Sequence, residues 1–192
     1  MIIDAHQHFW QLERGDYGWL MPDLASLYRD FMPDDLAPHL LQHDIDGTIL
    51  VQAAPTPAET EFLLDIADKT PFVLGIVGWT DFAAKSAASD IARLAKHPKL
   101  VGLRPMIQDI ADDDWMLRSV LTPAFEAMIQ CDLTFDALVL PRHLSQLRKL
   151  LSRHPNLRTV IDHGAKPDIS CGQFDDWANN IGGPAPITVL IM

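Results

Sequence analysis

The feature that most constrains the fold is a regular alternation of short apolar runs with longer stretches of helical periodicity. Six runs rich in branched residues have the length and composition of buried strands, at residues 2–5, 48–53, 72–79, 100–105, 133–139 and 159–162. Between them, apolar residues recur at helical spacing, as at Phe62, Leu63 and Ile66. A period of roughly 25 to 30 residues is typical of a parallel sheet with right-handed crossovers, so we predict a barrel or a doubly wound sheet.

Local signals place the helix boundaries. Thr56, Pro57 and Glu59 form a capping-box arrangement with proline at the first helical position, which predicts a helix that begins there. Prolines also mark where helices must end, at Pro71, Pro98 and Pro155.

The segment from Gln7 to Asp30 departs from this pattern. It contains Trp10, Tyr17 and Trp19 without a clear period and is predicted to be a long loop after the first strand. Long loops in compact domains are often functional. The alternative is an aromatic lid that is packed for stability alone.

Composition narrows the classes of partner and compartment. The formal charge of −11, from 26 acidic and 15 basic residues, would repel phosphate backbones and anionic lipid, so we expect neither nucleic acid nor membrane partners. Cys131 and Cys171 lie far apart and form no CxxC pair, which favours a reducing cytoplasm over a disulfide framework. No leader and no membrane span is expected.

The first strand ends in a pair of histidines. Side chains alternate along a strand, so His6 and His8 project from one face and can meet the same metal ion. Their position at the carboxyl end of a strand matters, because active sites of parallel βα barrels are built at that end. An isolated HxH pair can equally be structural.

A third histidine follows the sixth strand. His163 comes directly after a buried apolar run and precedes Gly164, so it is expected at the same mouth as His6 and His8. Three histidines there would suit zinc with one position open for water or substrate. The alternative is that His163 only hydrogen-bonds the loop of Gly164.

Other strand ends carry groups suited to substrate binding, namely Gln52, Trp79 and Arg104, and Asp136 lies within the fifth strand. A planar guanidinium such as that of Arg104 fits a carboxylate or lactone oxygen, although an ion pair with Asp136 is an equal alternative. The remaining histidines fall in or beside helices and are expected on the outer surface, with His143 able to reach the rim: His39, His43, His97, His143 and His154.

Glycines and absent motifs complete this picture. Gly47, Gly102 and Gly164 are expected at tight turns or close backbone approaches. The sequence has no GxSxG elbow, GxxxxGK loop or GxGxxG turn. No motif therefore indicates a serine hydrolase, a nucleotide-binding protein or a dinucleotide-binding protein.

Up to about Trp177, the chain resembles the amidohydrolase-related family that includes sugar lactonases. The matching stretches are IDAHQHFW at 3–10, VQA at 51–53, GIVGW at 75–79, GLRPM at 102–106, FD at 135–136 and VIDHGAKP at 160–167. The resemblance implies a (β/α)8 barrel in which His6, His8 and His163 face a shared centre. It also implies hydrolysis of a sugar 1,4-lactone. In that reaction a divalent metal, with zinc as the expected ion, or imidazolium groups polarise the carbonyl, while a carboxylate activates water.

The sequence departs from the family toward its carboxyl end. The family's strand-eight aspartate, in a segment resembling GSDWP, has no counterpart, nor has the strand-seven pattern resembling CKLSG. We therefore expect an incomplete barrel of about six βα units over residues 1–177 and an atypical tail at 178–192, with Asp136 as a substitute base. Open edges at the first and sixth strands would favour self-association, and the apolar run 187–192 could cover one of them.

Two other functions stay open at this point. A degenerate fragment without activity would bind zinc without turnover. A decarboxylase of the same superfamily would release carbon dioxide from a carboxylate substrate.

Overall fold

The computed structural model describes residues 1–172, 174–181 and 190–191. The chain divides into two compact units. The amino-terminal unit comprises Met1–Thr80 and Lys96–Gly102, and the carboxyl-terminal unit comprises Asp81–Ala95 and Leu103–Met192. The expectation of one partial domain over 1–177 stays a prediction, and residues 182–189 and 192 of the tail lie outside the described part of the chain.

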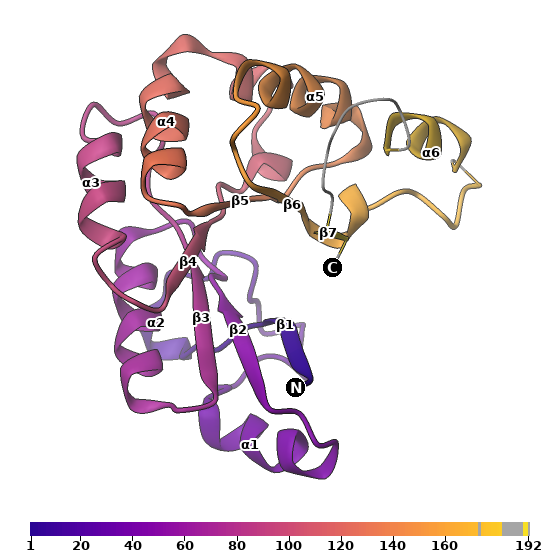
Figure 1. Cartoon of the computed structure of the whole chain (residues 1–192). Coiled ribbons are helices and arrows are strands. Elements are labelled where there is room, and N and C mark those ends of the chain that lie inside the picture. Colours follow the sequence, from indigo (N-terminus) through magenta and orange to yellow (C-terminus); the bar gives the residue numbers. More distant parts are fainter. Residues whose placement is uncertain (173, 182–189, 192) are drawn as a thin grey trace. The chain divides into compact units, whose positions relative to one another are not determined.

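The amino-terminal unit is a parallel sheet with helices in its crossovers (Figure 1). Its elements are β1 (Ile3–Gln7), η1 (Leu12–Arg14), α1 (Pro33–Gln42), β2 (Gly47–Val51), α2 (Pro57–Lys69), β3 (Val73–Gly78) and most of β4 (Leu100–Leu103). β2 pairs in parallel with β1 and with β3, while the Ile76 amide donates to the Lys99 carbonyl (2.7 Å) just before β4. All carboxyl ends of paired parallel strands therefore fall on one edge of this sheet.

The pairing of β1 with β2 contains an irregularity beside the histidines. Asp4 is opposite Thr48, whereas Gln7 is opposite Leu50, so β1 uses one more residue than β2 over this stretch. Such bulges bend a strand and redirect its side chains, and they occur next to active sites. In the structure β1 extends to Gln7, two residues beyond the end of the predicted strand.

The helix after β2 begins where the sequence predicts, but the capping box is only half formed. The Thr56 hydroxyl accepts from the Glu59 amide (3.1 Å), and Pro57 is the first helical residue. The Glu59 carboxylate does not return to the Thr56 amide, which donates instead to the Ala54 carbonyl (3.0 Å). Glu59 accepts from the Ala53 amide (3.0 Å), so it ties the helix to the exit of β2.

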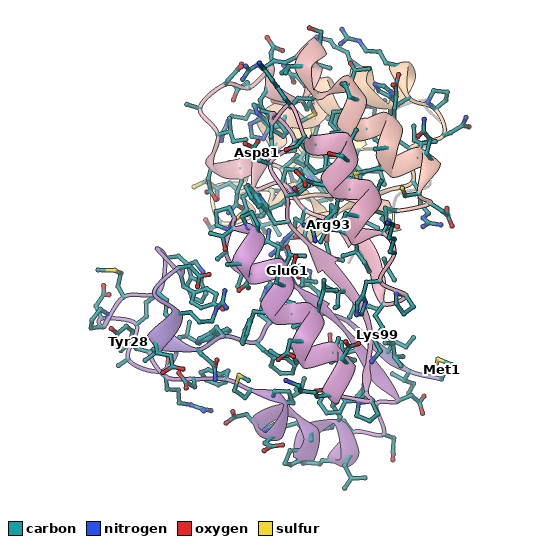
Figure 2. The ribbon with its side chains drawn as sticks, turned by 90° about the vertical axis from the view of Figure 1, so that its left-hand side faces the viewer. Met1, Tyr28, Glu61, Asp81, Arg93 and Lys99 are labelled. Atoms are coloured by element: carbon teal, nitrogen blue, oxygen red, sulfur yellow. The ribbon has the colours of Figure 1, made fainter. Side chains whose placement is uncertain are left out.

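The segment after β1 is folded against the amino-terminal unit. Trp10 and Phe31 form an antiparallel bridge that closes it, and Trp10, Tyr17 and Leu20 pack in one cluster with Ala53 and Ala54. The segment also carries exposed apolar side chains, among them Tyr28, which is labelled in Figure 2 where the loop projects from its unit. Packing and exposure are thus combined in one loop.

The carboxyl-terminal unit continues the strand–helix alternation (Figure 1). Its α-helices and strands are α3 (Ala87–Leu94), α4 (Thr122–Gln130), β5 (Thr134–Ala137), α5 (Leu144–Arg153), β6 (Thr159–Ile161), α6 (Asp175–Ile181) and β7 (Leu190–Ile191). Short 3-10 turns lie at Ile107–Asp109, Trp115–Leu117, Ser119–Leu121, Pro141–His143 and Asp162–Ala165. β5 and β6 pair in parallel, and the rings of Phe82, Phe125 and Phe135 contact one another in the core.

The six expected strands are all present, each within a few residues of its predicted bounds. α2 and α5 end two residues before Pro71 and Pro155, and α3 ends at Leu94, ahead of Pro98. Of the apolar run 187–192, the described residues Leu190 and Ile191 pair in parallel with Val160 and Ile161 of β6. None of the helices described here has the length and apolar character that crossing a membrane requires.

Gly47 is the position where close packing of the backbone most clearly demands glycine. A Cβ atom there would lie 2.5 Å from a Leu74 methyl carbon and 2.9 Å from the Phe72 carbonyl oxygen. We expect Gly47→Ala to lower the free energy of unfolding by roughly 1–3 kcal/mol, because backbone must move to relieve the overlap. Urea denaturation would measure this effect. Gly18→Ala is the control, since nothing lies within 4 Å of its added Cβ, and an equal loss in both variants would contradict the packing explanation.

Candidate active site

His6 and His8 converge as the alternation of β1 predicts. Their Nε2 atoms lie 3.1 Å apart, and their rings meet edge to face with centroids 4.8 Å apart. Two nitrogen ligands of one tetrahedral zinc ion lie about 3.3 Å apart. The pair therefore has the spacing of two ligands of a single ion.

A backbone contact sets the proton position on His8. Its Nδ1 lies 2.8 Å from the Val51 carbonyl oxygen, which accepts a hydrogen bond and therefore places the proton on Nδ1. The Nε2 of His8 is left with a lone pair, the form in which imidazole binds a metal. The last residue of β2 thus orients a candidate ligand that follows β1.

Two expected substrate-binding residues belong to the same unit. Gln52 is fully buried directly after β2, and its backbone amide donates to the Val77 carbonyl (2.9 Å). Trp79 follows β3 and is partly buried, and its backbone is clamped at both ends by the Thr60 hydroxyl, which accepts from the Trp79 amide and donates to its carbonyl, each at 2.7 Å. Both side chains leave from the carboxyl ends of their strands.

In the carboxyl-terminal unit, Arg104 and Asp162 form a buried ion pair. Arg104 Nη1 donates to Asp162 Oδ2 at 2.6 Å, and neither side chain is more than 4% exposed. A pair this deeply buried keeps both charges only when its hydrogen bonds are well aligned. Arg104 was expected at this strand end, whereas its partner Asp162 was not singled out, although an acidic residue that ends an apolar run was the available signal.

Asp136 lies on the same face of the β5–β6 sheet as Asp162. Asp136 is in register with Val160, and Val160 and Asp162 are two residues apart, so alternation places all three on one face. Phe135 points to the opposite face, into the aromatic core with Phe125. Asp136 is 1% exposed. The ion pair of Arg104 with Asp136 that the sequence left open stays a prediction.

The turn that carries His163 has an uncommon backbone. His163, Gly164, Ala165 and Lys166 all have positive φ, between 50° and 63°, and three of them are not glycine. Left-handed geometry costs about 1–2 kcal/mol per residue with a Cβ atom, and such strain concentrates at functional sites. The indole of Trp177 donates to the Gly164 carbonyl at 2.6 Å, and His163 Nε2 lies 3.8 Å from Asp162 Oδ2. The His163 side chain is 43% exposed.

The expectation that the other histidines lie on the outer surface is wrong for His143, which is fully buried. Its Nδ1 accepts from the Leu140 amide (3.1 Å), and its Nε2 lies 3.3 Å from an Asp113 carboxylate oxygen. It closes the turn before α5 and has a structural role there. The remaining four, His39, His43, His97 and His154, are exposed or partly exposed.

Comparison with known proteins places this arrangement in a family. Residues 3–182 match the amidohydrolase family. The chain is 51% identical over 175 residues to an L-fucono-1,5-lactonase of Burkholderia ambifaria. The aligned region covers 91% of this chain and 60% of that relative. It is 34% identical over 177 residues to an L-fucono-1,5-lactonase of Burkholderia multivorans, with 92% and 60% covered.

A solved structure agrees with the sequence relatives. An amidohydrolase of Burkholderia multivorans, crystallised with bound zinc, is 30% identical and superimposes with a TM-score of 0.90 over 100% of this chain and 68% of its own. The strand–helix fold is that of an amidohydrolase-type barrel, and the expected fold class, an incomplete (β/α)8 barrel, is confirmed. The chain belongs to the amidohydrolase family. It spans 60% of the length of the two curated lactonases that it matches.

Removing the Arg104 guanidinium would take its 2.6 Å ion pair from the buried Asp162 carboxylate. We expect Arg104→Leu to lower the free energy of unfolding by about 3–5 kcal/mol, because breaking a buried ion pair by removing one of its members is expensive. Chemical denaturation would measure it. Arg158→Leu is a matched control, since Arg158 pairs with Asp132 on the surface and exposed pairs contribute little. A similar effect in the two variants would show that burial of the pair does not matter.

The burial of His143 predicts a dependence of stability on pH. Burial lowers the pKa of His143, the neighbouring Arg142 charge lowers it further, and Asp113 opposes both. An unfolded histidine takes up a proton near pH 6.5, so below this pH the unfolded chain binds more protons and stability falls as pH decreases. We expect a smaller loss between pH 7.5 and 5.5 in His143→Asn, whose Oδ1 can accept from the Leu140 amide. Urea midpoints at both pH values measure this, and equal losses would exclude His143 as the cause.

Proposed function

We propose that this protein hydrolyses a sugar lactone, with L-fucono-1,5-lactone as the first substrate to test. The observation that carries the proposal is the convergence of His6 and His8 Nε2 at the carboxyl end of β1 (3.1 Å), in a chain 51% identical to a lactonase named for that substrate. The five-membered 1,4-lactones of L-fuconate and L-rhamnonate are the comparison substrates. The two Burkholderia relatives named above are lactonases, which favours ring opening over decarboxylation.

The histidines fit a divalent metal, and zinc is the ion that the related structure contains. The lone pair on His8 Nε2 and the spacing to His6 Nε2 suit two nitrogen ligands. We propose His163 as the third, because it follows β6 as His8 follows β1. A bound zinc ion would supply Lewis-acid polarisation of the lactone carbonyl.

The chain's own residues would supply binding and proton transfer. Gln52, Trp79 and Arg104 leave strand ends and would hold the sugar ring and its carbonyl oxygen. Asp136 would accept a proton from water as its oxygen adds to the carbonyl carbon. The ester C–O bond then breaks, the ring oxygen leaves as a hydroxyl group after protonation, and the aldonic acid ionises with net release of one proton.

Asp162 would assist by holding its neighbours. Its carboxylate is fixed by Arg104 at 2.6 Å and lies 3.8 Å from His163 Nε2. A carboxylate beside an imidazole favours the orientation and basicity that a metal ligand needs. We therefore assign Asp162 the role of positioning His163 and Arg104.

Two further proposals concern the state of the protein in the cell. The exposed apolar residues Met1, Ile2 and Ile3 at β1 favour self-association through this strand. The free thiols of Cys131 and Cys171 fit a cytoplasmic location. The non-enzymatic alternative is a zinc-binding chain without turnover.

The deciding experiment follows proton release from L-fucono-1,5-lactone, with zinc and with a chelator. We expect turnover above the spontaneous rate that the chelator removes. His163→Ala should abolish it and weaken zinc binding in calorimetry, while helix content by circular dichroism stays nearly unchanged. His39→Ala, an exposed histidine of α1, is the control and should behave as the original chain.

The possible results separate the candidate functions. Zinc binding by a folded sample without turnover would support the non-enzymatic alternative. Full activity in His163→Ala would remove this residue from the site. Release of carbon dioxide from an aromatic carboxylate, without lactone opening, would indicate a decarboxylase.

A further inference from the structure

A buried carboxylate holds the loop after β1 onto the exit of β2. Glu59, in the first turn of α2, is fully buried, and it accepts from the Ala53 amide (3.0 Å) and from the Tyr17 hydroxyl (2.8 Å). Arg14 Nη2 lies 3.3 Å from the same carboxylate. Three donors from two segments thus converge on one acidic group.

This network fixes the loop in more than one place. Arg14 also donates to Asp16 (2.6 Å), Asp16 accepts from the Thr56 hydroxyl (3.3 Å), and the Arg14 guanidinium lies 4.2 Å from the centre of the Phe62 ring. Burial raises the pKa of Glu59 even with these donors. Burying an acidic group is costly unless donors satisfy it, and here two of the donors come from the loop after β1. This cost indicates that the conformation of the loop has a role of its own.

The side chain that this arrangement presents is Trp19. Its indole Nε1 donates to the Ala53 carbonyl (2.9 Å), and its ring meets Trp10 edge to face with centroids 5.5 Å apart. Trp19 is nevertheless 40% exposed. A large aromatic ring is therefore oriented by a hydrogen bond and a ring contact, with much of its surface left open to solvent.

Trp19 and His8 are anchored on the same short stretch of chain. His8 Nδ1 donates to the carbonyl of Val51, and Trp19 Nε1 donates to the carbonyl of Ala53, two residues further on. Two residues of chain span at most roughly 7 Å. Gln52, a proposed substrate-binding residue, lies between the two carbonyls. The indole is thus placed at the strand end that orients a proposed metal ligand.

We infer that Trp19 is a substrate-contact residue, whose exposed indole takes the apolar C–H face of a sugar lactone. Glu59, Arg14 and Tyr17 are its positioning residues. This inference rests on the proposed function and extends it to the choice of substrate. A lid that served stability alone would gain more by burying the ring, whereas an amphipathic ring with its N–H satisfied and its surface exposed suits a ligand that is apolar on one face.

The experiment measures sugar binding separately from turnover. L-fuconate, the stable ring-opened product, is titrated into the zinc-loaded protein by calorimetry, and KM and kcat are measured with L-fucono-1,5-lactone. We expect Trp19→Ala to weaken L-fuconate binding and raise KM about five- to tenfold, with kcat and zinc affinity nearly unchanged. Trp19→Phe, which retains a ring, should recover part of the affinity and guards against misfolding of the alanine variant.

Matched variants distinguish contact from loop stability. Leu24→Ala removes a side chain of the same loop that is also 40% exposed, and it should leave KM unchanged. Glu59→Gln should raise KM with little change in kcat, because the loop is held less firmly.

Each result assigns success or failure to one proposal. Unchanged L-fuconate binding and KM in Trp19→Ala would overturn the role of Trp19 while lactone hydrolysis still stood. Trp19-dependent binding of L-fuconate without turnover would support the role and reject the hydrolase. Absence of L-fuconate binding to the original chain would overturn the inference.

Discussion

Parallel pairing of β1 with β2 is the constraint on which the candidate site depends. Because both strands run in the same direction, the segment after β1 lies beside the last residues of β2. The Val51 carbonyl can then orient the His8 ring, and the Ala53 carbonyl can receive the indole of Trp19. The irregular register between Asp4 and Gln7 adjusts the histidine pair within this frame. One backbone arrangement thus places a proposed metal ligand and a proposed sugar contact together.

The sequence predicts most of the fold because its information is local and repetitive. Apolar runs located all six strands, and Thr56 with Pro57 located the start of α2, since each signal depends on neighbours in the chain. The register shift in β1 was not predictable, because it depends on how two separate segments pair. The burial of His143 was missed for the same reason: its partners, the Leu140 amide and Asp113, are set by turn geometry rather than by spacing.

The sequence predicts the candidate site residues at the strand ends, but not the buried carboxylates that hold their neighbours in place. Strand-end position identifies His6, His8 and Arg104, because that rule needs only strand bounds. Asp162 and Glu59 are different, since an acidic residue becomes a buried partner only when a distant cation or amide is brought to it. In each unit a buried carboxylate therefore has contacts that only the tertiary structure reveals: Asp162 with Arg104, and Glu59 with Ala53 and Tyr17.

The left-handed turn after β6 restricts which sequences this segment can accept. Ala165 and Lys166 hold positive φ angles of 63° and 51° without the freedom of glycine. Branched residues such as valine, isoleucine or threonine would meet severe crowding at either position, whereas glycine or asparagine would relax it. A homologous chain could therefore vary widely in the helices that surround this turn and still have a narrow choice of residues in the four positions that begin with His163.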